Sequence, residues 1–155
     1  MVINPLELEE LRNKFSDKRI IFADGTFDLF HLGHVRSFRN LRTLGDIVVV
    51  AVLSDEWVKA KKGGKRPILS EEERVELVDS MRDVDYTILA SKDGQRTPTS
   101  QLLKSLRPNI FVSIDPVWED RRSEIEALGI ELQIIPRVHE SSTTNLIERI
   151  RKVWG

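Results

Sequence analysis

Short apolar runs alternate with helical patterns along most of this chain, and that alternation restricts the possible folds more than any other feature. The runs that predict buried strands are residues 19–24, 46–54, 86–90, 109–114 and 131–136. Helical patterns occupy residues 6–15, 35–44, 71–82, 97–106, 119–129 and 143–154. Such alternation is typical of parallel strands joined by right-handed crossovers. The sequence therefore predicts an α/β fold, a doubly wound parallel sheet of about five strands with helices on both faces.

Length and composition suit one domain. The chain has 155 residues, of which 40% are hydrophobic, and this is enough apolar material for a single core. We expect one domain over residues 1–155. Within it, residues 1–17 are predicted as a helix that leads into the fold rather than forming its core, and residues 19–153 as the catalytic core.

The charge balance excludes several classes of partner. The formal net charge of −1 gives no overall attraction to nucleic acid or to an acidic membrane surface, so any anion site must be local. The lack of cysteine excludes disulfides, thiolate metal ligands and a cysteine nucleophile. The N-terminal stretch lacks the pattern of a signal peptide, and no apolar segment reaches transmembrane length. We expect a cytoplasmic protein without nucleic-acid or membrane partners.

The stretch "GTFDLFHLGH", residues 25–34, directly follows the first predicted strand. Ligands of parallel sheets bind at the carboxyl ends of strands, where unpaired N–H groups begin the next helix. His31 and His34 would share one side of the first helical turn. Gly25 can adopt a positive φ, and Gly33 allows a bulky group to approach the backbone. A metal-binding pair is the alternative, but no third ligand is obvious nearby, so the cluster favours a phosphate site.

A basic segment that contains glycine follows the second predicted strand. The stretch "KAKKGGKRP" carries Lys59, Lys61, Lys62, Lys65 and Arg66. A run of this kind usually forms a solvated surface. The parallel sheet would place it beside the first loop, however, where mobile cations could close over a triphosphate. Its position therefore favours a phosphate-binding loop.

The helix predicted from Glu71 to Arg82 begins with a capping box, because Ser70 is followed three residues later by a glutamate. Arg74 and Arg82 lie eight residues apart, close to one face of this helix. They could form surface ion pairs with neighbouring glutamates, each worth less than about 1 kcal/mol. Alternatively, they could reach the site.

The last motif is "PRVHESSTTNLIERI", residues 136–150. Its Ser and Thr residues at 142–144 precede an apolar helical pattern and are predicted to cap that helix. Hydroxyls and free N–H groups at the carboxyl edge of a sheet can also hold phosphate. Both interpretations apply to the same residues.

Taken with its position, "GTFDLFHLGH" resembles the signature of the HxGH nucleotidyltransferases, the cytidylyltransferase-like family. The resemblance extends over residues 19–151. It implies a Rossmann-like sheet and transfer of a nucleoside monophosphate from an NTP to a phosphorylated acceptor, with release of pyrophosphate and assistance from Mg²⁺ bound mainly through the NTP phosphates. It also implies that His31 and His34 stabilise the transition state, without a covalent enzyme intermediate.

The resemblance also assigns the other motifs. The loop after the second strand is similar to that of heptose-phosphate adenylyltransferases, which implies phosphate contacts for Lys59, Lys62 and Arg66. The shorter loop of glycerol-phosphate cytidylyltransferase points instead to Lys61. The implied catalytic residues are His31, His34, Lys61 and Arg137. The implied nucleotide-binding residues are Gly25, Thr26, Phe27, Asp28, Gly33, Lys59, Lys62, Arg66, Asp115, Ser142, Thr143 and Thr144. The implied substrate contacts are Arg74, Arg82 and Trp118, and no metal ligand is assigned to the protein.

Two departures from the family pattern affect the predicted base. His139 and Glu140 replace the acidic residue and glycine that are usual in phosphoalcohol cytidylyltransferases. The stretch "FVSIDPVWED" lacks a glycine that relatives commonly carry; Asp115 and Trp118 stand in for the acidic and aromatic residues that follow it.

We therefore expect transfer of CMP from CTP to a small phosphorylated alcohol such as glycerol 3-phosphate. The alternative is an adenylyltransferase that acts on a sugar phosphate such as heptose 1-phosphate, or on FMN. A non-catalytic nucleotide-binding module is the alternative from another class. The expected partners are an NTP and a small phosphorylated acceptor, and a homodimer is possible because relatives are often dimers.

Overall fold

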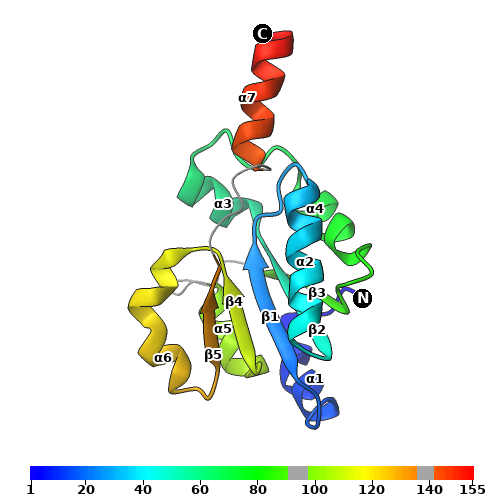
Figure 1. The fold of residues 1–155 in the computed structure, drawn as a ribbon, viewed down its shortest axis with the longest axis vertical. Coiled ribbons are helices and arrows are strands. Elements are labelled where there is room, and N and C mark those ends of the chain that lie inside the picture. Colours follow the sequence, from blue (N-terminus) through cyan, green and yellow to red (C-terminus); the bar gives the residue numbers. More distant parts are fainter. Residues whose placement is uncertain (91–97, 136–141) are drawn as a thin grey trace.

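A five-stranded parallel sheet forms the centre of the computed structural model, which describes residues 1–90, 98–135 and 142–155 (Figure 1). The strand order is β3-β2-β1-β4-β5. The strands are β1 (Ile20–Gly25), β2 (Ile47–Leu53), β3 (Tyr86–Ala90), β4 (Ile110–Ser113) and β5 (Glu131–Ile134). All four strand pairs are parallel, which confirms the doubly wound sheet.

Helices cover both faces of this sheet. They are η1 (Pro5–Glu7), α1 (Leu8–Lys14), α2 (Leu32–Leu44), α3 (Asp55–Lys62), α4 (Glu71–Asp79), α5 (Pro98–Leu106), η2 (Pro116–Arg121), α6 (Arg122–Glu126) and α7 (Thr143–Trp154). Side chains of α2 and α4 are buried in one cluster, and side chains of α1, α3, α5, η2 and α6 are buried in the other. The Rossmann-like α/β fold is therefore confirmed.

Alternation along the strands builds the two clusters. In β1, Ile20 and Phe22 enter the cluster that includes α1 and α5, whereas Ile21 and Ala23 enter the cluster that includes α2. All four side chains are buried. Because successive strand residues point to opposite faces, a continuous apolar run is what a strand covered on both sides requires.

The first helix packs more deeply than its pattern predicted. Leu8 is fully buried and Leu11 is 7% exposed, and both belong to the core cluster on the α5 side. The expectation that the leading helix stays out of the core is therefore wrong. The apolar spacing of the helix was correctly identified, but its burial depends on α5, which is far away in the sequence.

Helix α4 begins as predicted and ends earlier. Ser70 Oγ accepts a hydrogen bond from the N–H of Glu73, and the Glu73 carboxylate accepts one from the N–H of Ser70, which completes the capping box. The helix ends at Asp79 instead of Arg82. Two successive turns then lead into β3, closed by hydrogen bonds from Met81 and Val84 N–H groups.

The strand order places the candidate site. Strand β1 lies between β2 and β4, so the direction in which successive strands are added to the sheet reverses beside it, although all strands stay parallel. The segments that follow β1, β2 and β4 all leave the same edge of the sheet. Helix α7 extends away from the sheet beyond that edge (Figure 1). None of the helices in the described parts is both long and apolar enough to cross a membrane.

Gly45 ends α2 for a reason of space, because its backbone is extended and does not need a glycine conformation. A Cβ on Gly45 would lie 2.7 Å from the Arg19 carbonyl oxygen and 2.8 Å from Ile21 Cδ1. Gly45→Ala should therefore lower the free energy of unfolding by about 1–3 kcal/mol. Gly64→Ala is the matched control, because a Cβ there meets nothing within 4 Å. Equal urea midpoints for the two variants would contradict this account of Gly45.

Candidate active site

Two histidines stack at the start of α2, on the loop that follows β1. His31 is the N-cap residue, and its ring lies 3.8 Å from the His34 ring, centroid to centroid, with the planes 22° apart. The Gly33 N–H donates to His31 Nδ1 at 3.1 Å, and the His31 N–H donates to His34 Nδ1 at 3.3 Å. The predicted shared face of the two histidines is therefore present.

These hydrogen bonds set the tautomer of both rings. A neutral imidazole that accepts at Nδ1 carries its proton on Nε2, so both rings present an Nε2–H donor. Burial lowers the pKa of His34 to about 3, helped by the neighbouring His31, and burial also lowers the pKa of His31. Both histidines are consequently neutral donors near pH 7.

Phe27 supports His34 from behind. Its ring packs 5.4 Å from His34 and 5.3 Å from Phe38, and the residue is 8% exposed with a φ of 53°. A Cβ on Gly25 would lie 2.8 Å from this ring. Gly25 thus makes room for Phe27, and Phe27 fixes the position of His34. Gly25 and Phe27 thus support the site, and their predicted contact with a nucleotide stays a prediction.

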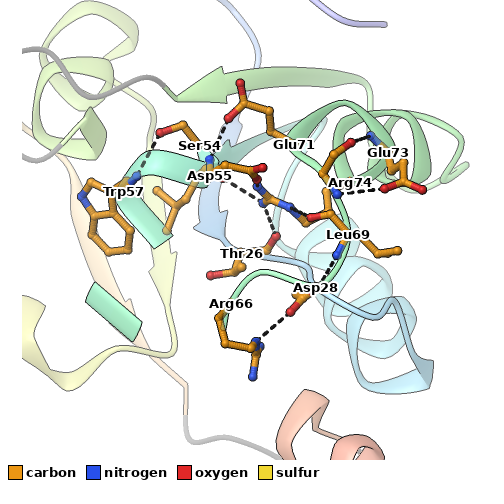
Figure 2. Close-up of polar contacts among 12 residues, drawn as sticks. Thr26, Asp28, Ser54, Asp55, Trp57, Arg66, Leu69, Glu71, Glu73 and Arg74 are labelled. Atoms are coloured by element: carbon orange, nitrogen blue, oxygen red, sulfur yellow. Dashed lines mark hydrogen bonds and ion pairs between the residues drawn. The ribbon is translucent and has the colours of Figure 1, made fainter. Parts of the chain in front are cut away.

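Asp28 holds the next loop against this one. Its carboxylate is 1% exposed and accepts hydrogen bonds from the Ile68 and Leu69 N–H groups and from Arg66 Nε (Figure 2). Its carbonyl accepts a hydrogen bond from Thr143 Oγ1 at 2.7 Å. Asp28 therefore faces the protein and joins three segments at the carboxyl edge.

Arg74 is the largest fully buried polar side chain of the described residues. Its Nη1 donates to the carbonyls of Thr26 and Leu53, its Nε to the carbonyl of Leu69, and its Nη2 to Asp55 (Figure 2). This burial corrects the prediction that Arg74 contacts substrate. It also corrects the alternative prediction, that Arg74 forms a surface ion pair with neighbouring glutamates. Arg74 shapes the site by joining the loops after β1 and β2.

The predicted basic loop is partly a helix. Ser54 caps α3, and acidic residues occupy its first turn, so that Lys59, Lys61 and Lys62 lie on the helix. Lys62 Nζ lies 2.9 Å from Thr26 Oγ1, and Lys61 Nζ lies 2.7 Å from Asp115 Oδ2. Adjacent lysines therefore reach two different segments of the carboxyl edge.

The remaining predicted residues divide into several groups. Lys59 is exposed, Ser142 caps α7 through the Asn145 N–H at 3.1 Å, and Thr144 is exposed on α7. Arg137 lies outside the described residues, as do His139 and Glu140. Gly33 lies between the two histidines in the chain, and its N–H donates to His31 Nδ1.

Two predicted substrate contacts are placed elsewhere. Arg82 precedes β3, so it lies at the amino edge of the sheet, opposite the site, and its side chain is 82% exposed. Trp118 is 5% exposed and packs its ring at 5.0 Å from Phe111, with Arg121 5.1 Å from the ring. Trp118 is a core residue. Both predictions are corrected by position.

Asp24 is a candidate residue that sequence reasoning missed. It is the acidic residue near the end of β1, and Thr99 Oγ1 donates to its Oδ2. Burial raises its pKa to about 6, opposed by the Thr99 hydrogen bond and the charge of Lys61. The signal was a carboxylate that closes an otherwise apolar run in "RIIFAD". Perturbed carboxyl groups at the carboxyl edge of a sheet are typical of ligand sites.

Among the described residues, no group of three or more His, Cys, Asp or Glu side chains is arranged to hold a metal ion. The chemistry that the site offers is a set of N–H donors and lysine cations at the end of the sheet. Such a set binds and stabilises negatively charged oxygen.

The model of the cytidylyltransferase-like family matches residues 22–149. The chain belongs to the cytidylyltransferase-like family. This membership identifies it as an NTP-dependent nucleotidyltransferase and confirms both the resemblance and the expected class of enzyme.

Curated relatives agree with this assignment. The bifunctional protein HldE of Geobacter sulfurreducens is 34% identical over 145 residues, which are 92% of this chain and 29% of that protein. HldE of Pelobacter propionicus is 36% identical over 148 residues, which are 94% of this chain and 29% of that protein. The chain thus spans less than a third of the length of these relatives.

Two crystal structures share the fold. The lipopolysaccharide core biosynthesis protein of Thermoplasma volcanium has a TM-score of 0.63 and 29% identity, and the match covers 80% of this chain and 99% of that one. Pantoate-beta-alanine ligase of Francisella tularensis has a TM-score of 0.62, and the match covers 88% of this chain and 66% of that one. Its 13% identity supports the fold alone.

Arg74→Met should lower the free energy of unfolding by about 3–5 kcal/mol, because it leaves Asp55 and three carbonyls without their buried donor. Arg82→Met is the matched control and should change it by less than about 0.5 kcal/mol. Urea unfolding measures both. If the Met variant does not fold, Arg74→Lys, which keeps the charge but loses the fork of donors, should give an intermediate midpoint. A midpoint for either Arg74 variant equal to that of Arg82→Met would contradict the bridging role.

Proposed function

We propose that this chain transfers AMP from ATP to a sugar phosphate of the heptose 1-phosphate type. The observation that supports nucleotidyl transfer is that Lys62 lies near the two histidines, which present Nε2–H donors. Its Nζ lies 2.9 Å from Thr26 Oγ1 on the loop that carries the histidines, and its charge acts on His34. Negative oxygen placed there would receive hydrogen bonds and a cationic charge together.

The choice of base and acceptor rests on the comparisons and on one loop. The stretch "KAKKGGKRP" is similar to that of heptose-phosphate adenylyltransferases. The curated relatives carry the name HldE, and a solved structure of 29% identity is named for lipopolysaccharide core biosynthesis, which is sugar chemistry. CMP transfer to glycerol 3-phosphate has less support, so the adenylyltransferase alternative replaces it.

The proposed reaction needs no covalent enzyme intermediate. An oxygen of the acceptor phosphate attacks the α-phosphorus of ATP, the bond from that phosphorus to the bridging oxygen breaks, and pyrophosphate leaves with the electron pair. His31 and His34 donate hydrogen bonds to the oxygens on which charge develops, and they keep their protons.

The lysines and the hydroxyls of the edge hold the rest of the substrate. Lys62 lies against the loop after β1, and Lys61 lies against Asp115 at the start of η2. We propose that they pair with phosphate oxygens, with Arg137 and the Ser and Thr residues at 142–144 in the roles that the family motif implies. Ligand binding would then bring these segments together.

Mg²⁺ is proposed to accompany the NTP, where it would neutralise phosphate charge. The described residues offer no three-ligand protein site for it. An ion bound mainly through the phosphates fits that donor set. A homodimer stays a prediction.

The first experiment is pyrophosphate release with Mg²⁺. ATP and CTP should be tested separately against heptose, glycerol, choline, ethanolamine and flavin phosphates. We expect release with ATP and a sugar phosphate. Release with CTP and a phosphoalcohol would overturn the proposed base and acceptor. NTP binding without release for any pair would support the non-catalytic module instead.

His34→Ala tests the assigned chemistry. It should lower kcat by about a hundredfold or more, because a donor to developing charge is lost, while NTP affinity measured by calorimetry should fall only modestly. Arg39→Ala, on the exposed side of α2, is the matched control and should leave kcat unchanged. Near-normal turnover of the His34 variant would refute the transition-state role.

A further inference from the structure

We infer that Asp24 binds hydroxyl groups of the acceptor and thereby selects a polyhydroxylated sugar phosphate over other phosphorylated acceptors. This inference rests on the proposed function and adds a residue to it. Asp24 belongs to neither the family motif described above nor the set of residues predicted from the sequence.

The position of Asp24 fits a ligand contact. It is the next-to-last residue of β1, the strand beside which the order of strand addition reverses. Strand alternation directs its side chain to the same face as Phe22, toward α5, whereas α2 covers the opposite face. Thr99 Oγ1, near the start of α5, donates to its Oδ2.

The fold does not need a charge at this position. Among the described residues, Asp24 forms no ion pair, and its hydrogen bond from the Thr99 hydroxyl could be accepted equally well by an asparagine oxygen. Burial also raises its pKa to about 6, so ionisation of this group destabilises the folded state near pH 7. A group that weakens the fold is typical of a ligand site.

Two adjacent lysines connect Asp24 with the phosphate loop. Lys62 contacts Thr26 on the loop after β1. Lys61 contacts Asp115, at the start of η2, and its positive charge also acts on Asp24. An acceptor phosphate held by Lys62 and the histidines would therefore extend its carbon skeleton toward Lys61 and Asp24. The phosphate that receives AMP would then lie near Lys62, and the sugar hydroxyls would lie near Lys61.

The surroundings favour neutral hydroxyls over an ammonium group. Lys61, on α3, acts on the charge of Asp24, whereas Arg121 of η2, which donates to Ser100 at 2.8 Å, is itself paired with Glu124. Asp115 is the other acidic group that acts on Asp24. Because Lys61 already supplies a cation to this neighbourhood, a carboxylate here is suited to accept hydrogen bonds from sugar hydroxyls.

Asp24→Asn is the test, measured with ATP and a set of sugar 1-phosphates. The variant keeps an acceptor for Thr99, so it should fold. Its acceptor KM should rise about tenfold, with kcat and the KM for ATP within about twofold of wild type, because a charge-assisted hydrogen bond becomes a neutral one. Asp17→Asn, in the turn before β1 at the opposite edge, is the matched control and should change nothing.

Monodeoxy sugar 1-phosphates make the test specific. With wild type, one analogue should have a kcat/KM about tenfold below that of the parent sugar phosphate. With Asp24→Asn, the kcat/KM values for this analogue and the parent should be equal, because the variant has already lost the same hydrogen bond. Equal losses in the two proteins for every analogue would overturn the inference. A merely structural Asp24 would give that result.

Other outcomes separate this inference from the proposed function. A wild type active on sugar phosphates with an unchanged acceptor KM for Asp24→Asn would overturn the inference alone. A rise in the KM for ATP of equal size would assign Asp24 to the nucleotide and overturn it as well. If the wild type acts only on choline or ethanolamine phosphate, and the variant loses this activity, Asp24 recognises an ammonium group instead of hydroxyls. That result would overturn both proposals.

Discussion

The buried guanidinium of Arg74 is the interaction on which the carboxyl edge depends. The loops that leave β1 and β2 cannot bond to each other as strands do, so their carbonyls need a donor from elsewhere. Arg74 supplies it to Thr26 and Leu53, which lie 48 and 21 residues away in sequence. Burying this cation is unfavourable unless each donor is satisfied, and Asp55 with the three carbonyls satisfies it. The geometry of the edge follows from that requirement.

Asp28 is the buried anion at the same edge, and it accepts hydrogen bonds where Arg74 donates them. Its buried carboxylate collects two backbone N–H groups and Arg66, and so fixes the segment after α3 against the loop after β1. One buried cation thus binds carbonyls and one buried anion binds N–H groups. Both charges are used within the protein, and the described residues at this edge that we propose for ligand binding are the His pair and the lysines of α3. A chain with a net charge of −1 can in this way offer a local anion site.

The sequence predicted the sheet and its first functional turn because those depend on local patterns. Apolar runs, the Ser70 capping box and the spacing of His31 and His34 are all readable within a few residues. The predictions for Arg74 and Trp118 failed because burial of either side chain depends on partners distant in sequence. The lysines of α3 were assigned to a loop because basic and glycine-rich composition outweighed the cap at Ser54 and the acidic first turn. Asp24 was missed because nothing in one strand shows that its last acid is half-buried and bonded to a residue of α5.

The helical state of α3 has a further consequence for the site. On a loop, neighbouring lysines could both turn to one anion, whereas on a helix successive side chains point about 100° apart. Lys61 and Lys62 are accordingly committed to different partners, Asp115 and Thr26. An anion bound at Lys62 is therefore near the histidines, while the environment of Lys61 is that of Asp24 and η2. Helix α3 thus directs one lysine to the loop that carries the histidines and the adjacent lysine to the segment that holds Asp115.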